Sequence, residues 1–457
     1  MRIKTTFLAT MTIGLLLVVC ISASSWAQGI RIGIIGDQTQ AGKSDPYITL
    51  VQGVEILERE NVDVVIHTGD LIEAGGQNES QYLAAFNRAV SLLEKLRVPW
   101  YLSPGDHDVN PPNYVPNSPD RTWEKYYQAA YRQRQPLVSG HLYYGFDLKG
   151  YHFISLHSVE HLWNDPRWGD VYLAQLSDNQ YRWLSEDLEK HRSAKGIVVF
   201  MHQPLWYNWT GWRRVHELLR RYPVRIVVAG HFHYNQDEGQ LDGIRYVIVG
   251  ATGGSVKEGN ARAGNVQHVS IMHVRGSKIV FKLIPVGSAG AIEPGSRSDM
   301  DKVQAIDTML SEKMYLFPIQ NPLCSKDGAI YADEKLSPVK LQLIPIGNPV
   351  DLPLQVTISL DSPSFTLKDP HFETGACQQI SPQGECQLSA SARLDYSNNS
   401  AIKFNDTLKP LWTAGLSASA PVEPGTALTL RVRVLFQGER GDYYLERRPQ
   451  TTITECK

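Results

Sequence analysis

The sequence predicts an α/β domain followed by an all-β sandwich domain, and three observations support this. From residue 28 to about residue 286, short runs rich in Val, Ile and aromatic residues alternate with amphipathic helical patterns, which indicates helices layered on a sheet. From about residue 322 onwards, alternating runs are broken by Pro, Gly, Asn and Ser, as in a β-sandwich. The chain has 457 residues, of which 42% are hydrophobic, so a sizeable core can form.

The α/β domain is expected over residues 28–286. Helices are predicted where apolar residues recur every three or four positions, as over residues 48–57 and 83–96. Ser177 followed by Gln180 is a capping-box signal for another helix. Its strand-length runs are Ile30–Ile35, Val62–His67, Val98–Leu102, Tyr151–Leu156, Gly196–Met201, Val224–Ala229 and Tyr246–Val249.

Residues 287–321 are expected to be a linker that holds one short helix, Asp299–Met314. The β-sandwich domain is then expected over residues 322–457. Its clearest strand patterns are Lys340–Ile346, Leu354–Leu360 and Leu428–Phe436.

Residues 1–27 are typical of a secretory signal peptide. Arg2 and Lys4 precede an apolar run over residues 7–21, and small residues mark a cleavage site after Ala27. Cleavage there predicts a periplasmic or secreted protein with no stable membrane insertion. An uncleaved membrane anchor is the main alternative, and lipidation at Cys20 is a weaker one.

The cysteines that remain after cleavage lie in the last third of the chain. There are four of them, Cys324, Cys377, Cys386 and Cys456, and in an oxidising compartment an even number predicts two disulfides with three possible pairings. We favour Cys377–Cys386, which closes a short loop, and Cys324–Cys456, which ties the end of the domain to its start. A zinc site is disfavoured because no CxxC pair or neighbouring His supports it.

Asp and His residues follow five of the expected strands at the point where each strand ends. Ligands of open α/β sheets bind beyond the carboxyl ends of the strands, so we expect these side chains to converge. Carboxylate and imidazole together suit Zn, Fe or Mn, and the set is large enough for two ions bridged by a carboxylate, an arrangement that promotes phosphoryl displacement. The residues are Asp37, Asp70, Asp106, His107, Asp108, His202, His231 and His233.

In this order the motifs resemble those of the calcineurin-like metallophosphoesterase superfamily, whose pattern is D-x-H, GD, GNH-D/E, H and GH-x-H. The resemblance covers roughly residues 30–285 and implies two packed mixed sheets flanked by helices. The matching stations are Asp37-Gln38-Thr39, Gly69-Asp70, Gly105-Asp106-His107-Asp108, His202 and Gly230-His231-Phe232-His233.

The resemblance also implies roles for these residues. Asp70 would bridge two metal ions, and His107 would act as general acid or transition-state stabiliser, oriented by Asp108. The remaining candidates divide between the ions: Asp37 and His233 would bind the first, and Asp106, His202 and His231 the second.

Two departures from the family pattern concern the metals. Thr39 stands where the family has a His and is a poor ligand, and Asp106 replaces the usual Asn. Purple acid phosphatases, a branch of the superfamily, also lack that His and use a Tyr three residues after the bridging Asp. Here that position is Glu73, which could supply a carboxylate to the first ion or be an ordinary solvated loop residue. Extra carboxylates favour Mn or Fe over a purely zinc site.

Aromatic and basic residues gather shortly after His202. Trp209 and Arg213 are the candidate substrate-binding residues of this segment, as a platform for an organic group and its phosphate. The alternative is a lid or helix start packed on the fold. Seven histidines with no matching station are expected to be structural: His67, His141, His152, His157, His161, His268 and His273.

These observations predict an exported binuclear metal-dependent phosphoesterase that hydrolyses phosphomonoesters or phosphodiesters by metal-hydroxide attack. The alternative is a non-catalytic phosphate-binding or scaffold protein with a degenerate first metal site. We expect a small phosphoester as substrate. A nucleic-acid partner is not expected, because the formal net charge is −2 and no basic excess exists.

Overall fold

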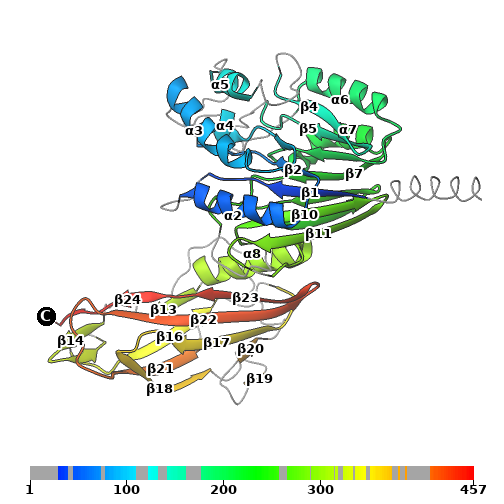
Figure 1. The fold of residues 1–457 in the computed structure, drawn as a ribbon. Coiled ribbons are helices and arrows are strands. Elements are labelled where there is room, and N and C mark those ends of the chain that lie inside the picture. Colours follow the sequence, from blue (N-terminus) through cyan, green and yellow to red (C-terminus); the bar gives the residue numbers. More distant parts are fainter. Residues whose placement is uncertain are drawn as a thin grey trace, which may run out of the picture. The chain divides into compact units, whose positions relative to one another are not determined.

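The computed structural model divides into two compact units, with the boundary between Pro294 and Gly295 (Figure 1). It describes residues 29–39, 45–73, 78–109, 122–131, 141–160, 176–256, 265–288, 290–312, 314–317, 323–332, 335–345, 350–372, 379–380, 386–388 and 412–456. The predicted signal peptide and the predicted partner Cys377 lie outside these residues. No helix of the described part of the chain is long and apolar enough to cross a membrane.

The first unit contains two mixed sheets. One has the strand order β11-β10-β1-β2-β3, in which β1, β2 and β3 are parallel and β10 is antiparallel to β1. Its strands are β1 (Ile30–Ile35), β2 (Val64–His67), β3 (Trp100–Leu102), β10 (His268–Arg275) and β11 (Lys278–Pro285).

The second sheet follows the order β8-β9-β7-β6-β5-β4. Its four central strands are parallel, and the antiparallel strands β4 and β8 pair with its two outermost parallel members. These strands are β4 (Tyr144–Leu148), β5 (Tyr151–Ser155), β6 (Ile197–Phe200), β7 (Val224–Ala229), β8 (Gln236–Leu241) and β9 (Ile244–Ile248).

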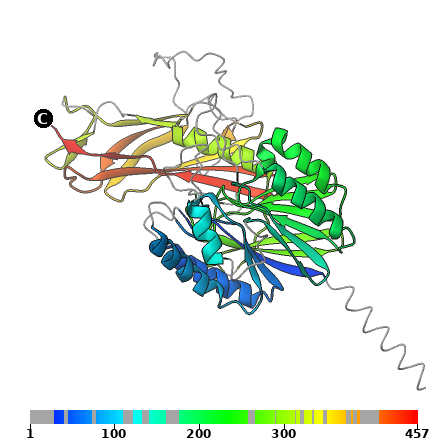
Figure 2. The ribbon, with the colours of Figure 1, turned by 90° about the horizontal axis from the view of Figure 1, so that it is seen from above.

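Helices cover the outer faces of both sheets, as Figure 2 shows for the blue helices on one flank and the green helices on the other. Strand β6 explains the layering, because its side chains alternate: Val198 and Phe200 join the core shared with the first sheet, whereas Ile197 and Val199 pack with α6 and α7. The helices are α2 (Pro46–Arg59), α3 (Glu79–Leu93), α4 (Asp106–Val109), α5 (Thr122–Tyr131), α6 (Asp178–Lys190), η1 (Leu205–Tyr207) and α7 (Trp209–Leu219). The predicted α/β class and its two helix-flanked mixed sheets are confirmed.

Local capping fixes where two of these helices begin. The Ser177 side chain accepts the Gln180 backbone N–H at 3.1 Å, as the sequence predicts for α6. Asn78 and Gln81 form a reciprocal capping box at the start of α3. Such caps satisfy backbone N–H groups that have no partner within the helix.

The second unit is rich in strands, consistent with the predicted β-sandwich. Its two larger sheets have the orders β13-β16-β21-β18 and β19-β20-β17-β22-β23, and a small sheet joins β15, β14 and β25. Its elements are β12 (Gly295–Ser296), α8 (Arg297–Glu312), β13 (Met314–Phe317), β14 (Cys324–Lys326), β15 (Ala329–Tyr331), β16 (Lys340–Pro345), β17 (Leu354–Leu360), β18 (Phe365–Phe372), β19 (Gln379–Ile380), β20 (Cys386–Leu388), β21 (Trp412–Ala418), β22 (Ala427–Gly438), β23 (Gly441–Arg447), β24 (Gln450–Thr452) and β25 (Thr454–Glu455).

Helix α8 is part of the second unit. The sequence predicts this helix within a linker. The buried Asp299 carboxylate accepts the backbone N–H groups of Glu439 and Arg440 at 2.8 and 3.0 Å, next to the turn that joins β22 to β23. Asp307 forms an ion pair with Arg447 of β23. These contacts span about 140 residues of sequence, which local patterns cannot reveal.

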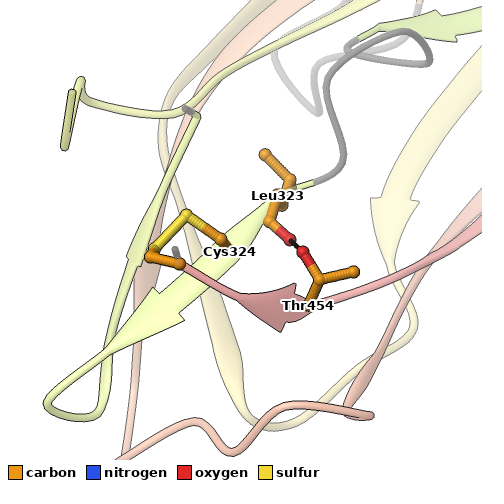
Figure 3. Close-up of a disulfide and its surroundings, with 4 residues drawn as sticks. Leu323, Cys324 and Thr454 are labelled. Atoms are coloured by element: carbon orange, nitrogen blue, oxygen red, sulfur yellow. Dashed lines mark hydrogen bonds between the residues drawn. A yellow bond between two sulfur atoms is a disulfide. The ribbon is translucent and has the colours of Figure 1, made fainter. Parts of the chain in front are cut away.

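A disulfide closes the small sheet of the second unit. Cys324 and Cys456 are bonded across 132 positions of sequence, as predicted. Beside them the Thr454 backbone N–H donates to the Leu323 carbonyl at 2.8 Å, and the Thr454 hydroxyl donates to the same oxygen at 3.2 Å (Figure 3). The covalent bond and the β14–β25 pairing therefore hold the same two segments together.

Candidate metal centre

The loops that follow β1, β2, β3, β6 and β7 are hydrogen-bonded to one another. Asp37 N–H donates to the Gly69 carbonyl at 3.0 Å, and Gln38 N–H donates to the Asp70 carbonyl at 2.8 Å. Gly230 N–H donates to the His202 carbonyl at 2.8 Å. The carboxyl ends of the parallel strands in both sheets thus meet at one place, where the sequence predicted the site.

Four candidate metal-binding residues have left-handed backbone conformations. The φ angles are 51° at Asp37, 57° at Asp70, 75° at His231 and 56° at His233. Each such conformation costs a non-glycine residue about 1 kcal/mol. The fold maintains this strain at the residues that carry the chemistry.

The first donor group consists of Asp37, Asp70 and His233, whose donor atoms lie within 4.8 Å of one another. His233 Nε2 is 3.7 Å from Asp37 Oδ1. Its Nδ1 lies 2.6 Å from the Ser255 carbonyl oxygen, so Nδ1 carries the proton and Nε2 presents its lone pair to the group.

The second donor group consists of Asp106, His202 and His231. His202 Nε2 and His231 Nδ1 lie 2.7 and 3.0 Å from the same oxygen, Asp106 Oδ1, and 3.2 Å from each other. His202 Nδ1 faces the Thr68 carbonyl oxygen at 3.0 Å, which again leaves Nε2 as the donor atom for an ion.

Asp70 joins the two groups. Its donor atoms also fall within 4.8 Å of those of Asp106 and His107, and Asp70 Oδ1 lies 3.4 Å from His202 Nε2. A carboxylate shared in this way occupies the position of a bridging ligand between two ions.

The residues present fit two cations. Asp37 Oδ2 is buried and has no hydrogen-bond partner, although a buried carboxylate oxygen needs one or a cation. A Cβ at Gly230 would lie 2.6 Å from this oxygen, so glycine keeps the space beside it open. Burial raises the pKa of Asp70 well above its usual range. Burial also opposes ionisation of Asp106, but hydrogen bonds from His202 and His231 hold the pKa of Asp106 well below its usual range.

His107 forms a pair with Glu73, since His107 Nδ1 lies 2.7 Å from Glu73 Oε1. Burial alone would lower the pKa of His107, but Glu73 and the nearby Asp70 and Asp106 outweigh it and raise this pKa to about 9. A protonated imidazole beside the donor groups can give a proton to a leaving oxygen.

Residues 30–235 match the family model of the calcineurin-like phosphoesterases. This stretch of the first unit is therefore similar to that family. Purple acid phosphatase 21 of Arabidopsis thaliana is 27% identical over 217 residues, which are 45% of this chain and 44% of the relative. Purple acid phosphatase 23 of the same plant is 30% identical over 149 residues, 30% of this chain and 29% of the relative. The chain therefore spans less than half the length of these curated relatives.

Two solved structures are similar to this chain at low identity. A dimetal phosphatase from Danio rerio has a TM-score of 0.45 at 14% identity and covers 58% of this chain and 99% of its own. A purple acid phosphatase from yellow lupin seeds has a TM-score of 0.43 at 15% identity and covers 59% of this chain and 54% of its own.

Three further residues of the first unit contact the candidate ligands or the loops that carry them. The Thr39 hydroxyl donates to Asp70 Oδ2 at 3.2 Å, so Thr39 orients a candidate ligand. The two oxygens of Asp108 accept the backbone N–H groups of Asp70, Ile72 and Gly105 at 2.9, 3.1 and 2.9 Å and brace two loops, and the expected role of Asp108 in orienting His107 stays a prediction. Glu73 Oε1 lies beside His107 Nδ1, and its expected role as a carboxylate of the first ion stays a prediction.

The predicted substrate residues lie on α7. Trp209 is 43% exposed, and its ring packs 5.4 Å from that of His216 in the same helix. Arg213 is exposed. The aromatic ring that lies between the candidate ligands is Phe232, which the sequence placed within the last motif but to which we assigned no role. Its position between His231 and His233 is the sequence feature that could have indicated a role in the site.

A further group of potential donors lies outside the candidate metal centre. It contains Asp147, His152 and His191, and His152 is level with Ile197, the first residue of β6, so the group lies at the opposite end of the sheet. The two imidazole rings are stacked 3.6 Å apart at an angle of 7°.

Proposed function

We propose that this chain is an exported, binuclear metal-dependent phosphoesterase that hydrolyses small phosphomonoesters or phosphodiesters. The junction of two His-carboxylate groups at Asp70 supports this most strongly, together with the purple acid phosphatase relatives. Such donors suit Mn, Fe or Zn. The ions, when bound, would activate water and offset negative charge on the phosphoryl oxygens.

The carboxylates impose a strict need for cations. Asp37, Asp70 and Asp106 belong to adjoining donor groups, and without cations their ionised forms would repel a phosphate anion over a few ångströms in a buried site. Metal removal is therefore expected to abolish substrate binding as well as turnover.

His107 is the proposed proton donor. The ester bond that breaks leaves an alkoxide or phenoxide, and the protonated His107 ring supplies the proton that neutralises it. Glu73 stabilises that protonated ring through Nδ1. Asp108 holds the loops that carry Asp70 and His107 in register, since it accepts backbone N–H groups from both loops.

Export is part of the proposal. It is supported by the signal-peptide pattern of residues 1–27 and by the Cys324–Cys456 disulfide, because such bonds persist in oxidising compartments. The location expected is periplasmic or secreted.

The test is hydrolysis of 4-nitrophenyl phosphate and bis(4-nitrophenyl) phosphate by residues 28–457. The protein is stripped with chelator and resupplied with Mn, Fe or Zn, and bound metal is counted. We expect turnover only with metal and two ions per chain. With ethyl phosphate, whose leaving group needs a proton, His107→Ala should lower kcat at least 100-fold. The preferred ester distinguishes a monoesterase from a diesterase.

The matched control is His273→Ala, which removes a histidine of β10 outside the site. It should retain the wild-type rate. Absence of turnover with every metal, together with one bound ion per chain, would overturn the proposal in favour of a phosphate-binding or scaffold protein whose first site is disabled at Thr39.

A further inference from the structure

Three aromatic rings form a continuous surface beside the candidate metal centre. We define them as the aromatic ledge: Tyr207, Phe232 and Tyr234. Phe232 lies between the candidate ligands His231 and His233, and its ring centroid is 5.4 Å from that of His231. Tyr207 meets Phe232 edge to face at 5.0 Å, and Tyr234 stacks on Phe232 at 5.5 Å.

The outermost ring of the ledge is held in place although it is exposed, whereas Phe232 and Tyr234 are half-buried. Tyr207 is 46% exposed, and its hydroxyl donates to Glu238 Oε1 of β8 at 2.7 Å. Gln236 Nε2 donates to the same carboxylate oxygen at 2.6 Å. A ring fixed in this way loses little further freedom when a ligand packs against it, so the surface is preorganised.

Aromatic rings beside a phosphate-binding centre, one of them exposed and fixed, match a particular kind of substrate. Aromatic faces and edges pack favourably against other flat rings. The Phe232 ring lies 5.4 Å from the ring of His231, which belongs to the second donor group. Glu238 adds negative charge at the rim, which disfavours a second phosphate there.

We propose that the aromatic ledge binds the leaving group, and that the preferred substrates are phosphoesters whose leaving group is a flat, uncharged aromatic ring. This inference rests on the proposed function and names its substrate class. It transfers the role of substrate platform from Trp209, which packs on His216 of its own helix, to Tyr207 and Phe232.

The experiment compares kcat/KM for phenyl phosphate with kcat/KM for ethyl phosphate in the metal-loaded protein. The two esters differ in intrinsic reactivity, but this difference cancels when the phenyl-to-ethyl ratio of a variant is divided by that of the wild type. We expect this ratio to fall about tenfold in Phe232→Leu and about fivefold in Tyr207→Leu.

The matched control for Tyr207→Leu is Tyr222→Leu. Tyr222 also has its hydroxyl on a glutamate, Glu189, at 3.1 Å, but it lies just before β7, at the end of the sheet away from the metal centre. Its phenyl-to-ethyl ratio should match that of the wild type. A ratio that falls in Trp209→Leu and not in Phe232→Leu would overturn the assignment to the ledge.

A second readout does not depend on turnover. Phenylphosphonate and methylphosphonate are not hydrolysed, and calorimetry gives their dissociation constants. We expect phenylphosphonate to bind the wild type more tightly and to lose this advantage in Phe232→Leu. If the wild type hydrolyses both esters and no variant alters the kcat/KM ratio or the phosphonate affinity ratio, the ledge does not bind the leaving group, and the proposed phosphoesterase function is retained. If the wild type hydrolyses neither ester, the proposed function fails, and the phosphonate ratio still decides the ledge.

Discussion

At the scale of single residues, three side chains near Asp70 make different contacts in the candidate metal centre. Thr39 orients Asp70 through a hydrogen bond, Asp108 braces the backbone of the loops, and Glu73 contacts His107. Glu73 is half exposed, with 48% of its side chain accessible. Its effect on His107 therefore comes from its negative charge and its hydrogen bond, and not from packing.

Glu73→Gln tests whether Glu73 serves His107. The variant keeps the shape of the side chain but loses the charge that favours protonated His107, so kcat for ethyl phosphate should fall about tenfold or more. Turnover of 4-nitrophenyl phosphate should change much less, because that leaving group departs without a proton. The metal content should stay at the wild-type level.

The control for this variant is Glu79→Gln, an exposed glutamate in the first turn of α3, for which neither ester should change. If Glu73→Gln lost one ion per chain and both esters slowed equally, Glu73 would be a metal ligand after all.

Asp108→Asn tests the loop brace. The carboxylate accepts three backbone N–H groups with two oxygens, whereas an amide has a single acceptor oxygen. The free energy of unfolding should fall by about 2 kcal/mol, measured by urea denaturation of the metal-free protein. Asp178→Asn, at a residue exposed beside Arg214, should leave it unchanged. A stable Asp108→Asn protein with a slow kcat would instead restore the role of Asp108 in orienting His107.

The identities of the candidate ligands could be predicted from the sequence, but their partners could not. Strand-end glycines and the spacing of Asp37, Asp70 and His202 depend on local patterns that a single sequence displays. The Ser255 and Thr68 carbonyls that orient His233 and His202 carry no side-chain signal. The pairing of Glu73 with His107 depends on how two loops meet, which is a tertiary property.

At the scale of secondary-structure elements, a cluster of two histidines and two aspartates connects β4, β5 and α6. His152 is buried between Asp147 of β4 at 2.9 Å and Asp187 of α6 at 2.7 Å. His191, just after α6, stacks on its ring. Burial disfavours the charged ring, but the two carboxylates outweigh burial and raise the pKa of His152.

This cluster makes stability depend on pH. A histidine whose pKa is raised by folding stabilises the protein fully below its unfolded pKa of about 6.5, and the contribution is lost as the pH rises through the folded value. The free energy of unfolding of the wild type should therefore decrease from pH 6 to pH 9, measured by urea denaturation of metal-free protein.

His152→Gln should remove this pH-dependent contribution and lower stability at pH 6 by about 3 kcal/mol, because the buried Asp187 loses its charged partner. His273→Ala again provides the control, and its pH dependence should follow that of the wild type. An unchanged slope in His152→Gln would show that other groups cause the pH dependence.

At the scale of the whole molecule, the buried strands were the easiest to predict. The bounds of β1 and β7 agree with the predicted ranges residue for residue, since their Val- and Ile-rich runs end at a glycine. Strand β8, Gln236–Leu241, is polar and was not predicted, because it pairs with β9 only on one side within the first unit. Helix α8 was predicted as a helix, but its place in the second unit depends on contacts about 140 residues away.

Cys456→Ser tests the disulfide of the second unit. The bond closes a loop of 132 positions, and its loss should lower the free energy of unfolding of that unit by about 4 kcal/mol. Calorimetry should show one transition moving to lower temperature while the transition of the metal-loaded first unit stays in place. Reductant added to the wild type should reproduce the shift, and an unmoved transition in both cases would mean that the β14–β25 pairing suffices.

The long span of this disulfide has a consequence for biosynthesis. Cys377 and Cys386 are translated after Cys324 and before Cys456, so oxidation in order of appearance would join Cys324 to a wrong partner. The correct bond then requires thiol–disulfide exchange after residue 456 has entered the oxidising compartment. A cell that produces this protein in quantity would need a disulfide isomerase in the compartment where it folds, and yield should depend on that enzyme more than on the rate of oxidation.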